Sequence, residues 1–429
     1  MSVSARSAAL AALGDVLRKR RPLDAALNTA LGAADLSARD AGFANTIVYE
    51  TLRRFGQLDG LVHHFVPKSP PPHKAGPTLE ILLAGACELV FLDVAPHAAV
   101  DGANRLAAAD PKAVHFKPLI NAALRRIARE GKDVAAAQDA GRLNLPDWLW
   151  ARWSEVFGEA TTRAIAQAHL IVAPLDIAGA EDHAELRALP ASQMLPGGIL
   201  RLHEAGRTEN LPGFAEGAWW VQDFAASLPV RLLGDMRGQT VIDLCAAPGG
   251  KTAQLVRAGA HVVAVEREPS RAAVLRGNLA RLRMAADIVQ ADVRDYKPAP
   301  HAPLVLLDAP CSATGTIRRH PDLPWIKSAA DIFACTDTAS ELIDAAAEMV
   351  AENGLLVFAV CSLEPEEGFE QIARFLERHQ EFRREALCAE EMLGLSELIS
   401  PEGDLRTLPC HFAPSGGMDG FYAARLRRK

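Results

Sequence analysis

The stretch Val241-Ile-Asp-Leu-Cys-Ala-Ala-Pro-Gly-Gly-Lys-Thr252 decides the fold of this chain. An apolar run ends in Asp243, and Pro248-Gly249-Gly250 then lets the backbone approach a ligand before a helix opens near Lys251. A phosphate-binding P-loop is excluded because that motif requires glycine where this chain has Cys245. The G-x-G-x-x-G of nicotinamide enzymes is also missing. The stretch therefore predicts a doubly wound α/β site for a small adenosine-containing cofactor.

Length and composition indicate an ordinary globular protein of two or three domains. The chain has 429 residues, of which 49% are hydrophobic and 23% charged. It contains no apolar run long enough to span a membrane, and its start, Met1-Ser-Val-Ser-Ala-Arg6, lacks the apolar core of an export signal. The seven cysteines are scattered without a C-x-x-C pair, which argues against a disulfide framework or a zinc site. We expect a cytoplasmic monomer with reduced thiols, no metal and no membrane contact.

The overall charge does not by itself indicate a nucleic-acid partner. The net charge is −7 and the pI is about 6.0, whereas domains that bind nucleic acid are usually basic. Basic clusters are local, and any one of them is more often a solvated helix face or tail than a binding site. The clusters are Arg18-Lys-Arg-Arg21, Arg125-Arg126 with Arg129, Arg318-Arg319, and the C-terminal Arg425, Arg427, Arg428 and Lys429.

Residues 1–133 predict an all-helical domain. Apolar residues recur there at helical spacing, and Pro67-Lys-Ser-Pro-Pro-Pro72 separates two helices because such a run cannot itself be helical. The apolar stripes are Leu10, Leu13 and Leu17; Phe43 and Ile47; Leu79, Leu82, Leu83, Ala86 and Leu89; and Leu119, Ala123 and Ile127.

The remainder of the chain predicts three segments. An Ala/Asp/Gln-rich linker covers 134–144, and a small α+β subdomain with short apolar segments such as Leu170–Val172 and Gly198–Leu202 covers 145–215. From 216 to 429 strands alternate with helices, which predicts a mostly parallel sheet with ligands at the carboxyl ends of its strands. The expected strands are Thr240–Leu244, His261–Val265, Asp287–Gln290, Pro303–Leu307 and Gly354–Val360, with an antiparallel edge strand at Gly420–Leu426.

Acids and thiols follow the successive predicted strands. The second strand is followed by Glu266, where an acid can accept hydrogen bonds from both ribose hydroxyls. Asp292 lies near the end of the third strand and is placed to accept a hydrogen bond from an exocyclic amine such as that of adenine. The fourth strand leads to Asp308-Ala-Pro-Cys311 and the fifth to Cys361. A lone buried cysteine is usually structural, but this whole set at neighbouring strand ends predicts a catalytic site.

Two thiols beside a cofactor pocket indicate covalent chemistry on an electron-poor ring. Addition of a thiolate to carbon 6 of cytosine makes carbon 5 nucleophilic enough to attack a methyl sulfonium. A protonated Asp308 is suited to hydrogen-bond ring nitrogen 3 and the amine, and Lys251 is a candidate cation for lowering a thiol pKa. A second thiol can assist when the carbon-5 proton leaves and the first thiol is expelled. The residues alone leave open whether Cys311 or Cys361 attacks.

These motifs resemble those of the RsmB/NOP-type (Sun) RNA 5-methylcytosine methyltransferases over about residues 145–429. The resemblance implies a Rossmann-like methyltransferase domain that uses S-adenosylmethionine, with Cys361 as the nucleophile and Cys311 as the residue that helps release the product. The matching segments are Asp243-Leu-Cys-Ala-Ala-Pro-Gly-Gly-Lys251, Asp308-Ala-Pro-Cys-Ser-Ala-Thr-Gly315, Cys361-Ser-Leu-Glu-Pro-Glu-Glu367, Val221-Gln-Asp223 and Met418-Asp-Gly-Phe-Tyr422. The implied cofactor residues are Cys245, Ala246, Ala247, Pro248, Gly249, Gly250, Lys251, Glu266, Asp292 and Asp308.

The helical domain resembles the NusB-like RNA-binding domain that bacterial members of this family carry ahead of their catalytic part. The pairing implies 16S rRNA as the substrate, by analogy at the level of the fold. The matching segments are Asp40-Ala-Gly-Phe-Ala-Asn-Thr-Ile-Val-Tyr49, Leu52-Arg-Arg54 and Asn121-Ala-Ala-Leu-Arg-Arg-Ile127. The chain departs from the family pattern at Val360, where threonine is usual, at Glu266, where Asp is more frequent, and in Cys335–Ser340, which lacks a common glutamine. None of these changes removes a required group.

The sequence leaves three functions open. The first is cytosine-5 methylation of ribosomal RNA, the second is the same chemistry on tRNA, and the third is a non-catalytic RNA-binding or ribosome-assembly factor. An intact glycine turn and both thiols favour an enzyme. Arg318 and Arg319 follow the Asp308 motif and are predicted to contact the RNA strand, whose target base must be splayed out of its stack.

Overall fold

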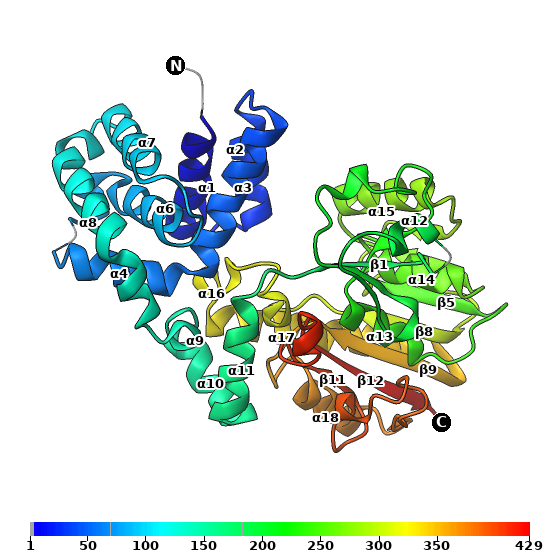
Figure 1. Cartoon of the computed structure of the whole chain (residues 1–429). Helices are drawn as coiled ribbons and strands as arrows, with labels where there is room; N and C mark the ends of the chain where they lie inside the picture. Colours follow the sequence, from blue (N-terminus) through cyan, green and yellow to red (C-terminus); the bar gives the residue numbers. More distant parts are fainter. Residues whose placement is uncertain (1–3, 69, 182) are drawn as a thin grey trace. The chain divides into compact units, whose positions relative to one another are not determined.

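The computed structural model describes residues 4–68, 70–181 and 183–429, which divide into two compact units (Figure 1). One unit comprises Met1–Ile171 and Ile317–Lys327, and the other comprises Val172–Thr316 and Ser328–Lys429. Residues 1–3 of the N-terminal segment, and Ser69 of the proline-rich break, lie outside the described residues.

The first unit is helical, as predicted, because apolar residues that recur at helical spacing are buried against one another. Its elements are α1 (Ala5–Lys19), α2 (Leu23–Gly32), α3 (Ala38–Arg53), α4 (Phe55–Phe65), α5 (Pro72–Ala75), α6 (Thr78–Val90), α7 (Pro96–Ala109), η1 (Ala113–Phe116), α8 (Lys117–Ala136), α9 (Ala140–Leu143), α10 (Asp147–Phe157), α11 (Glu159–His169) and α16 (Leu323–Ile326). Leu13, Ile47, Leu83 and Ile127 of the predicted stripes are at most 1% exposed. The prediction that the whole proline-rich run is non-helical is wrong at its end, because Pro72 begins α5, where proline is tolerated.

The boundary between the units falls later than the predicted start of the α+β subdomain. Residues 145–171 contain α10 and α11 and belong to the helical unit, not to the connecting subdomain. The Arg53 guanidinium donates to the His169 carbonyl at 2.9 Å, and the Gln57 amide donates to Asn144 Oδ1 at 3.0 Å. These long-range bonds attach the segment to α3 and α4, which sequence periodicity does not reveal. Leu170–Val172 is not a strand but forms the turn that follows α11, which ends at His169.

A short segment from late in the sequence also belongs to the helical unit. This segment, Ile317–Lys327, comes shortly after the motif that runs from Asp308 to Gly315. Its residue Ile326 packs in the apolar cluster formed mainly by α1, α2 and α3. The Trp325 indole N–H donates to the Leu52 carbonyl at 3.0 Å, and the Asp322 carboxylate accepts from the Leu23 amide at 2.9 Å. The segment is therefore held by the helices that open the chain.

A four-stranded antiparallel sheet in the order β2-β3-β1-β4 opens the second unit. A fully buried ion pair lies within it, since both Nε and Nη2 of Arg201 donate to the Asp176 carboxylate at 2.7 Å. Arg201 also donates to the carbonyls of Ser415 and Gly417, and Asp176 accepts from the Phe224 amide. The elements are β1 (Leu175–Ala178), α12 (Ala184–Arg187), β2 (Ser192–Met194), η2 (Pro196–Gly198), β3 (Leu200–Leu202), η3 (Thr208–Asn210) and β4 (Trp220–Val221).

The large sheet is doubly wound, which confirms the predicted fold class. Its strand order is β10-β12-β9-β8-β5-β6-β7, with β11 also paired to β12. Strands β5 to β9 are parallel, and β12 is antiparallel to its neighbours. The chain moves outward from β5 in both directions, so ligands are expected at the carboxyl ends of β5 and β8. The strands are β5 (Thr240–Leu244), β6 (His261–Val265), β7 (Asp287–Val289), β8 (Ala302–Asp308), β9 (Val350–Val360), β10 (Phe382–Arg384), β11 (Leu405–Thr407) and β12 (Phe421–Arg428).

Helices bury both faces of this sheet, as parallel strands require. Val241 and Ile242 are neighbours in β5, yet they belong to different apolar clusters because successive side chains point to opposite faces. Helices α13, α14 and α15 contribute to one cluster, and α17 and α18 contribute to the other. The remaining elements are α13 (Phe224–Arg231), α14 (Gly250–Arg257), α15 (Pro269–Leu282), η4 (Thr314–Thr316), α17 (Ala329–Glu348), α18 (Phe369–Arg378), η5 (Ser396–Leu398) and η6 (Ala413–Ser415). Within the described residues, no helix is long and apolar enough to cross a membrane.

Replacement of Arg201 by methionine is expected to destabilise the second unit by about 3–5 kcal/mol, because it leaves the buried Asp176 carboxylate without its cation. Urea unfolding followed by tryptophan fluorescence measures the change. Arg207→Met is the matched control, since Arg207 pairs with Glu209 in solvent, and its loss should cost less than about 1 kcal/mol. Equal effects of the two substitutions would show that the buried pair has no special role.

Candidate active site

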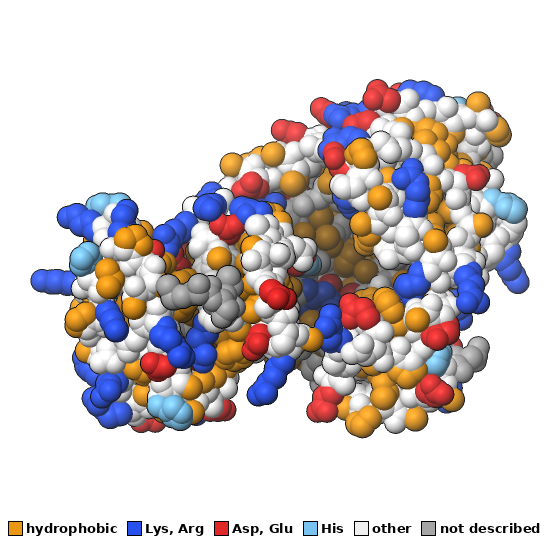
Figure 2. Space-filling view, turned by 90° about the horizontal axis from the view of Figure 1, so that it is seen from above, with side chains coloured by type: hydrophobic (Ala, Val, Ile, Leu, Met, Phe, Trp, Pro, Cys, Tyr) orange, Lys and Arg blue, Asp and Glu red, His pale blue; other side chains and the backbone are white. Residues whose placement is uncertain are grey.

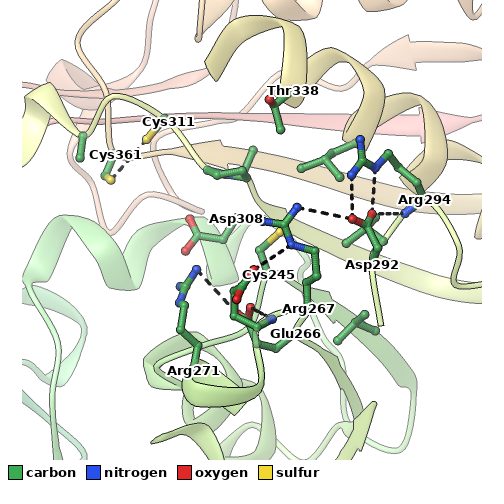
Figure 3. A pocket seen from close by; sticks show the side chains of 17 residues that line it. Cys245, Glu266, Arg267, Arg271, Asp292, Arg294, Asp308, Cys311, Thr338 and Cys361 are labelled. Carbon is green, nitrogen blue, oxygen red and sulfur yellow. Dashed lines mark hydrogen bonds and ion pairs between the residues drawn. The ribbon is translucent and has the colours of Figure 1, made fainter. Parts of the chain in front are cut away.

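A pocket of about 390 Å³ lies at the carboxyl ends of the parallel strands (Figure 3). In Figure 3 the two cysteine sulfurs are drawn well apart from Asp292 and Arg294, with Asp308 between them. The structure therefore brings six of the predicted site residues together in one pocket. The predicted site residues that line the pocket are Cys245, Glu266, Asp292, Asp308, Cys311 and Cys361.

The glycine turn after β5 begins α14 and is tied to the acid after β6. Gly249 precedes the helix with φ = 105°, a left-handed backbone that favours glycine, and a Cβ there would lie 2.6 Å from Leu275 Cδ1. The Ala247 amide donates to Glu266 Oε2 at 3.4 Å, and the Glu268 amide donates to Glu266 Oε1 at 3.0 Å. Glu266 is only 3% exposed. The turn and the acid are thus held as one structure.

Asp292 is fixed by an arginine that the sequence analysis did not single out. Nε and Nη2 of Arg294 donate to the two Asp292 carboxylate oxygens at 2.9 and 2.7 Å, and the Arg294 amide adds a bond of 3.0 Å. These bonds hold the pKa of Asp292 well below its usual range. Arg294 also pairs with Glu341 of α17 at 2.7 Å. Asp292 is therefore an ionised acceptor with a fixed orientation.

Lys251, the candidate cation for lowering a thiol pKa, contacts a carboxylate in this structure. Its Nζ lies 2.8 Å from Asp308 Oδ2 and 5.0 Å from the centre of the Phe421 ring. Lys251 is largely buried at the start of α14, and Asp308 is the last residue of β8. The ion pair links the glycine turn to the Asp308 motif because β5 and β8 are neighbours in the sheet. The proposed hydrogen bond from a protonated Asp308 to cytosine stays a prediction.

The thiols of Cys311 and Cys361 face each other. Cys311 Sγ lies 3.5 Å from Cys361 Sγ, one in the loop after β8 and the other directly after β9. The hydrogen bond to Cys361, together with burial, raises the pKa of Cys311 well above its ordinary value. A thiol with a raised pKa keeps its proton more firmly, and either sulfur can be the donor in this contact.

Cys245 lines the same pocket but has a different environment. Burial raises the pKa of its thiol to about 12, and the nearby carboxylates of Asp308 and Glu266 add to this effect. A thiol that remains protonated is a poor nucleophile. Cys245 therefore suits a packing role beside the cofactor and not a covalent one.

The structure contradicts the predicted RNA contact of Arg318 but not that of Arg319. Arg318 is only 1% exposed within the helical unit, and its carbonyl accepts a hydrogen bond from the Arg53 guanidinium at 2.9 Å. Arg318 belongs to segment Ile317–Lys327, which is part of that unit. Arg319 is partly exposed, so its RNA contact stays a prediction.

Comparison with known proteins places these residues in a family. The chain is 34% identical to the ribosomal RNA small subunit methyltransferase B of Vibrio cholerae (100% of this chain, 98% of the relative). It is 36% identical to the protein of that name from Pseudomonas putida, over 98% of each. The chain belongs to the RsmB family. Residues 230–427 match the family described as 16S rRNA methyltransferase RsmB/F, and residues 3–129 match the NusB family. The predicted family, its methyltransferase domain and its NusB domain are confirmed.

Solved structures agree with the fold. The crystal structure of PH0851 superposes with a TM-score of 0.77 at 22% identity and covers 100% of both chains. NSun6 from Pyrococcus horikoshii with SFG superposes with a TM-score of 0.54 at 19% identity, over 66% of this chain and 98% of that one. At these identities the likeness shows the shared fold. The family is one of S-adenosylmethionine-dependent methyltransferases, and this RsmB-family protein is one of them.

The residues present fit S-adenosylmethionine. Glu266 offers a fixed, buried carboxylate for two ribose hydroxyls, and Asp292 offers an ionised acceptor for an amine. The left-handed Gly249 leaves the turn free of a side chain. The individual cofactor contacts, including those of Ala246, Ala247, Pro248 and Gly250, stay predictions.

Sequence reasoning missed several residues that complete the pocket. Arg294 lies only two positions after Asp292, and a basic residue so close to an expected acceptor was a usable signal. Thr338 lines the pocket from α17 and falls within Cys335–Ser340, the segment already noted for its missing glutamine. Val360, the other departure from the family pattern, is fully buried in the apolar core and does not line the pocket.

Asp243 makes the stability of the site depend on pH. Its carboxylate is fully buried, accepts from Thr252 Oγ1 at 2.5 Å, and burial raises its pKa from 3.8 to about 7. Between these values the folded protein keeps a proton that the unfolded chain loses. The stability that this carboxyl contributes is therefore complete below its ordinary pKa and is lost as the pH rises through about 7.

Asp243→Asn removes this titration. From about pH 4 to 7 its unfolding free energy should rise relative to that of the wild type, by at most about 1.4 kcal/mol per pH unit. Denaturant unfolding at several pH values across this range checks the trend. Asp287→Asn, an exposed acid at the start of β7, is the control and should show no such slope. A constant difference between Asp243→Asn and wild type would contradict the raised pKa.

Proposed function

We propose that this RsmB-family protein methylates carbon 5 of a cytosine in 16S rRNA through a covalent adduct with Cys361. The observation that carries the proposal is the pair of sulfurs, Cys311 and Cys361, which lie 3.5 Å apart and line a pocket that also contains the carboxylates of Glu266 and Asp292. Methyl transfer to nitrogen or oxygen does not require two thiols, whereas carbon 5 of cytosine must first be activated.

In the proposed reaction the Cys361 thiolate forms a bond to carbon 6 of the flipped-out cytosine, and the electron pair of the carbon 5–carbon 6 double bond moves toward ring nitrogen 3. S-adenosylmethionine, when bound, supplies an electrophilic methyl group, which becomes attached to the now nucleophilic carbon 5. A base then removes the carbon-5 proton, the bond between Cys361 Sγ and carbon 6 breaks, and the ring double bond returns. Cys311 assists this last stage as the neighbouring group that exchanges protons with the leaving sulfur.

The ion pair of Lys251 with Asp308 supports the proposed ring chemistry. The ammonium of Lys251 holds one oxygen of Asp308 at 2.8 Å and so orients the carboxyl group at the end of β8. A carboxyl group fixed there is suited to hydrogen-bond the cytosine amine and nitrogen 3. In this reading Lys251 acts on the base through Asp308 and does not activate a thiol.

The proposed substrate follows from the relatives and from the NusB domain. The curated relatives are named for the small ribosomal subunit, and the matching family is described as acting on 16S rRNA. Figure 2 shows Lys and Arg side chains interspersed with Asp and Glu, so charge alone does not identify the RNA. Transfer RNA remains the alternative substrate with the same chemistry. The predicted cytoplasmic location is part of this proposal.

The decisive experiment measures methyl transfer from labelled S-adenosylmethionine to unmodified total bacterial RNA, with 5-methylcytosine mapped by sequencing. One site in 16S rRNA that is lost with Cys361→Ala supports the reaction, the nucleophile and the substrate together. Methylation confined to tRNA would overturn the substrate and keep the mechanism. If no RNA is methylated, the protein is a binding or assembly factor.

Cys311→Ala should trap the enzyme on its RNA, because addition by Cys361 proceeds while release is slowed. A denaturing gel of enzyme, RNA and cofactor should show a slow-migrating covalent species that wild type forms only transiently. Cys311→Ala with Cys361→Ala is the control and should form no adduct. Absence of the adduct in Cys311→Ala would reverse or remove the proposed division of labour between the thiols.

Substitutions of the neighbouring residues Arg318 and Arg319 should have different effects on RNA binding and on stability. Arg319→Ala should weaken RNA binding by roughly three- to tenfold and reduce its salt dependence, as expected for a lost phosphate contact. Arg318→Ala should instead lower the melting temperature, because it empties a buried position in the helical unit. Filter binding and thermal unfolding measure the two effects, and equal losses of RNA affinity would contradict this assignment.

A further inference from the structure

A buried polar network joins the loops that carry the two thiols. The Glu367 carboxylate accepts from the Ser312 amide at 2.8 Å and from the Ser312 hydroxyl at 2.6 Å. The Ser312 hydroxyl lies 3.3 Å from that of Ser362, which in turn lies 3.3 Å from that of Thr314. All four side chains are at most 1% exposed. Ser312 and Ser362 are the residues directly after the two reactive cysteines.

Backbone bonds reinforce the same junction. The Gly315 amide donates to the Cys361 carbonyl at 3.1 Å, and the Leu363 amide donates to Thr314 Oγ1 at 3.0 Å. A Cβ on Gly315 would lie 2.0 Å from the Gly420 carbonyl oxygen, so only glycine permits this approach. Arg406 donates to the carbonyls that follow Cys361, at 3.1 and 2.6 Å. The two loops are therefore bonded through side chains and through backbone.

The charge of Glu367 is unusual for this position. Burial raises the pKa of its carboxyl group, and the hydrogen bonds from Ser312 and Ser362 oppose that rise. A buried carboxylate costs more free energy than an apolar side chain of similar size unless its geometry is needed. One oxygen of Glu367 accepts a hydrogen bond from the Ser312 amide, and the other accepts one from the Ser312 hydroxyl. This pair of hydrogen bonds restrains the Ser312 backbone, and through it the neighbouring Cys311.

We propose that Glu367 is a positioning residue that sets the spacing and relative orientation of the Cys311 and Cys361 thiols, by clamping Ser312 from the loop that begins at Cys361. The inference rests on the proposed covalent mechanism for its consequence in catalysis. Its geometric part, the juxtaposition of the thiols, does not depend on that mechanism. Release of the adduct needs both sulfurs in place, and a misplacement of about 1 Å is enough to lower a rate by as much as 100-fold.

The test compares Glu367→Gln with Glu370→Gln. Glu370 is a partly exposed carboxylate three residues away that pairs with Arg374 at 3.4 Å. Glu367→Gln should lower kcat for methyl transfer by about tenfold or more while KM for RNA and Kd for S-adenosylmethionine change less than about twofold. It should also accumulate the covalent RNA adduct, whereas Glu370→Gln should behave as wild type. A merely destabilised protein would lose kcat in proportion to its folded fraction and would not accumulate adduct.

A second measurement needs no methyl transfer. Alkylation by iodoacetamide, followed by mass spectrometry, gives the separate reaction rates of Cys311 and Cys361 in the folded protein. Glu367→Gln should change the rate of at least one of these thiols by about threefold or more, because their mutual hydrogen bond is disturbed. Glu370→Gln should change neither rate. This readout distinguishes a failure of the clamp from a failure of the proposed reaction.

Ser312→Ala tests the clamp without altering the carboxylate, and it covers the case in which Glu367→Gln does not fold. The variant keeps the hydrogen bond from the backbone amide of residue 312 to Glu367 and loses the one from the hydroxyl. It should therefore lower kcat less than Glu367→Gln does, again with little change in KM. Combined with Glu367→Gln it should cause little further loss, since both act through one contact. Wild-type alkylation rates in folded Glu367→Gln, or fully additive losses in the double variant, would overturn the proposal.

Discussion

The parallel pairing of β8 with β9 is the constraint on which the active site depends. Asp308 pairs with Ala359 in this register, and the Ala309 amide donates to the Ala359 carbonyl at 2.9 Å. The loop after β8 therefore leaves the sheet beside the residue that follows β9, so Cys311 meets Cys361. A register shift would move the side chains of either strand to the opposite face. The thiols are close because the carboxyl ends of β8 and β9 lie side by side in the sheet, not because their motifs attract each other.

Buried charged groups then fix the positions of segments that the sheet brings close together. Arg201 with Asp176, Lys251 with Asp308, and Glu367 with Ser312 each place a charged group where an apolar one would cost less to bury. In every case the group bonds to segments that are far apart in sequence. Such contacts are strongly directional, whereas apolar packing tolerates small displacements. The site thus combines a hydrophobic frame with a few polar clamps at the points where position matters to the chemistry.

The same logic explains where sequence reasoning failed. Arg318 and Arg319 were interpreted as a surface pair because they follow a catalytic motif, but the first is buried among helices from the start of the chain. Lys251 is a candidate cation for a thiol in the sequence, and its partner in the structure is the acid at the end of β8. Neighbours in sequence are therefore a poor guide to which side chains meet in space. Partners across a sheet or from an inserted segment leave no local pattern.

The sequence by itself determined the fold class, most strand positions, the family, and the acids and thiols of the site. It could do so because strand and helix periodicity are local, and because each motif residue has a chemical role that few other residue types perform. Only the tertiary structure decided the end of the helical unit near Ile171, the pairing of Lys251 with Asp308, and the 3.5 Å separation of the thiols. Those features depend on contacts between segments tens to hundreds of residues apart, whose free energies are fixed by packing and not by local propensity.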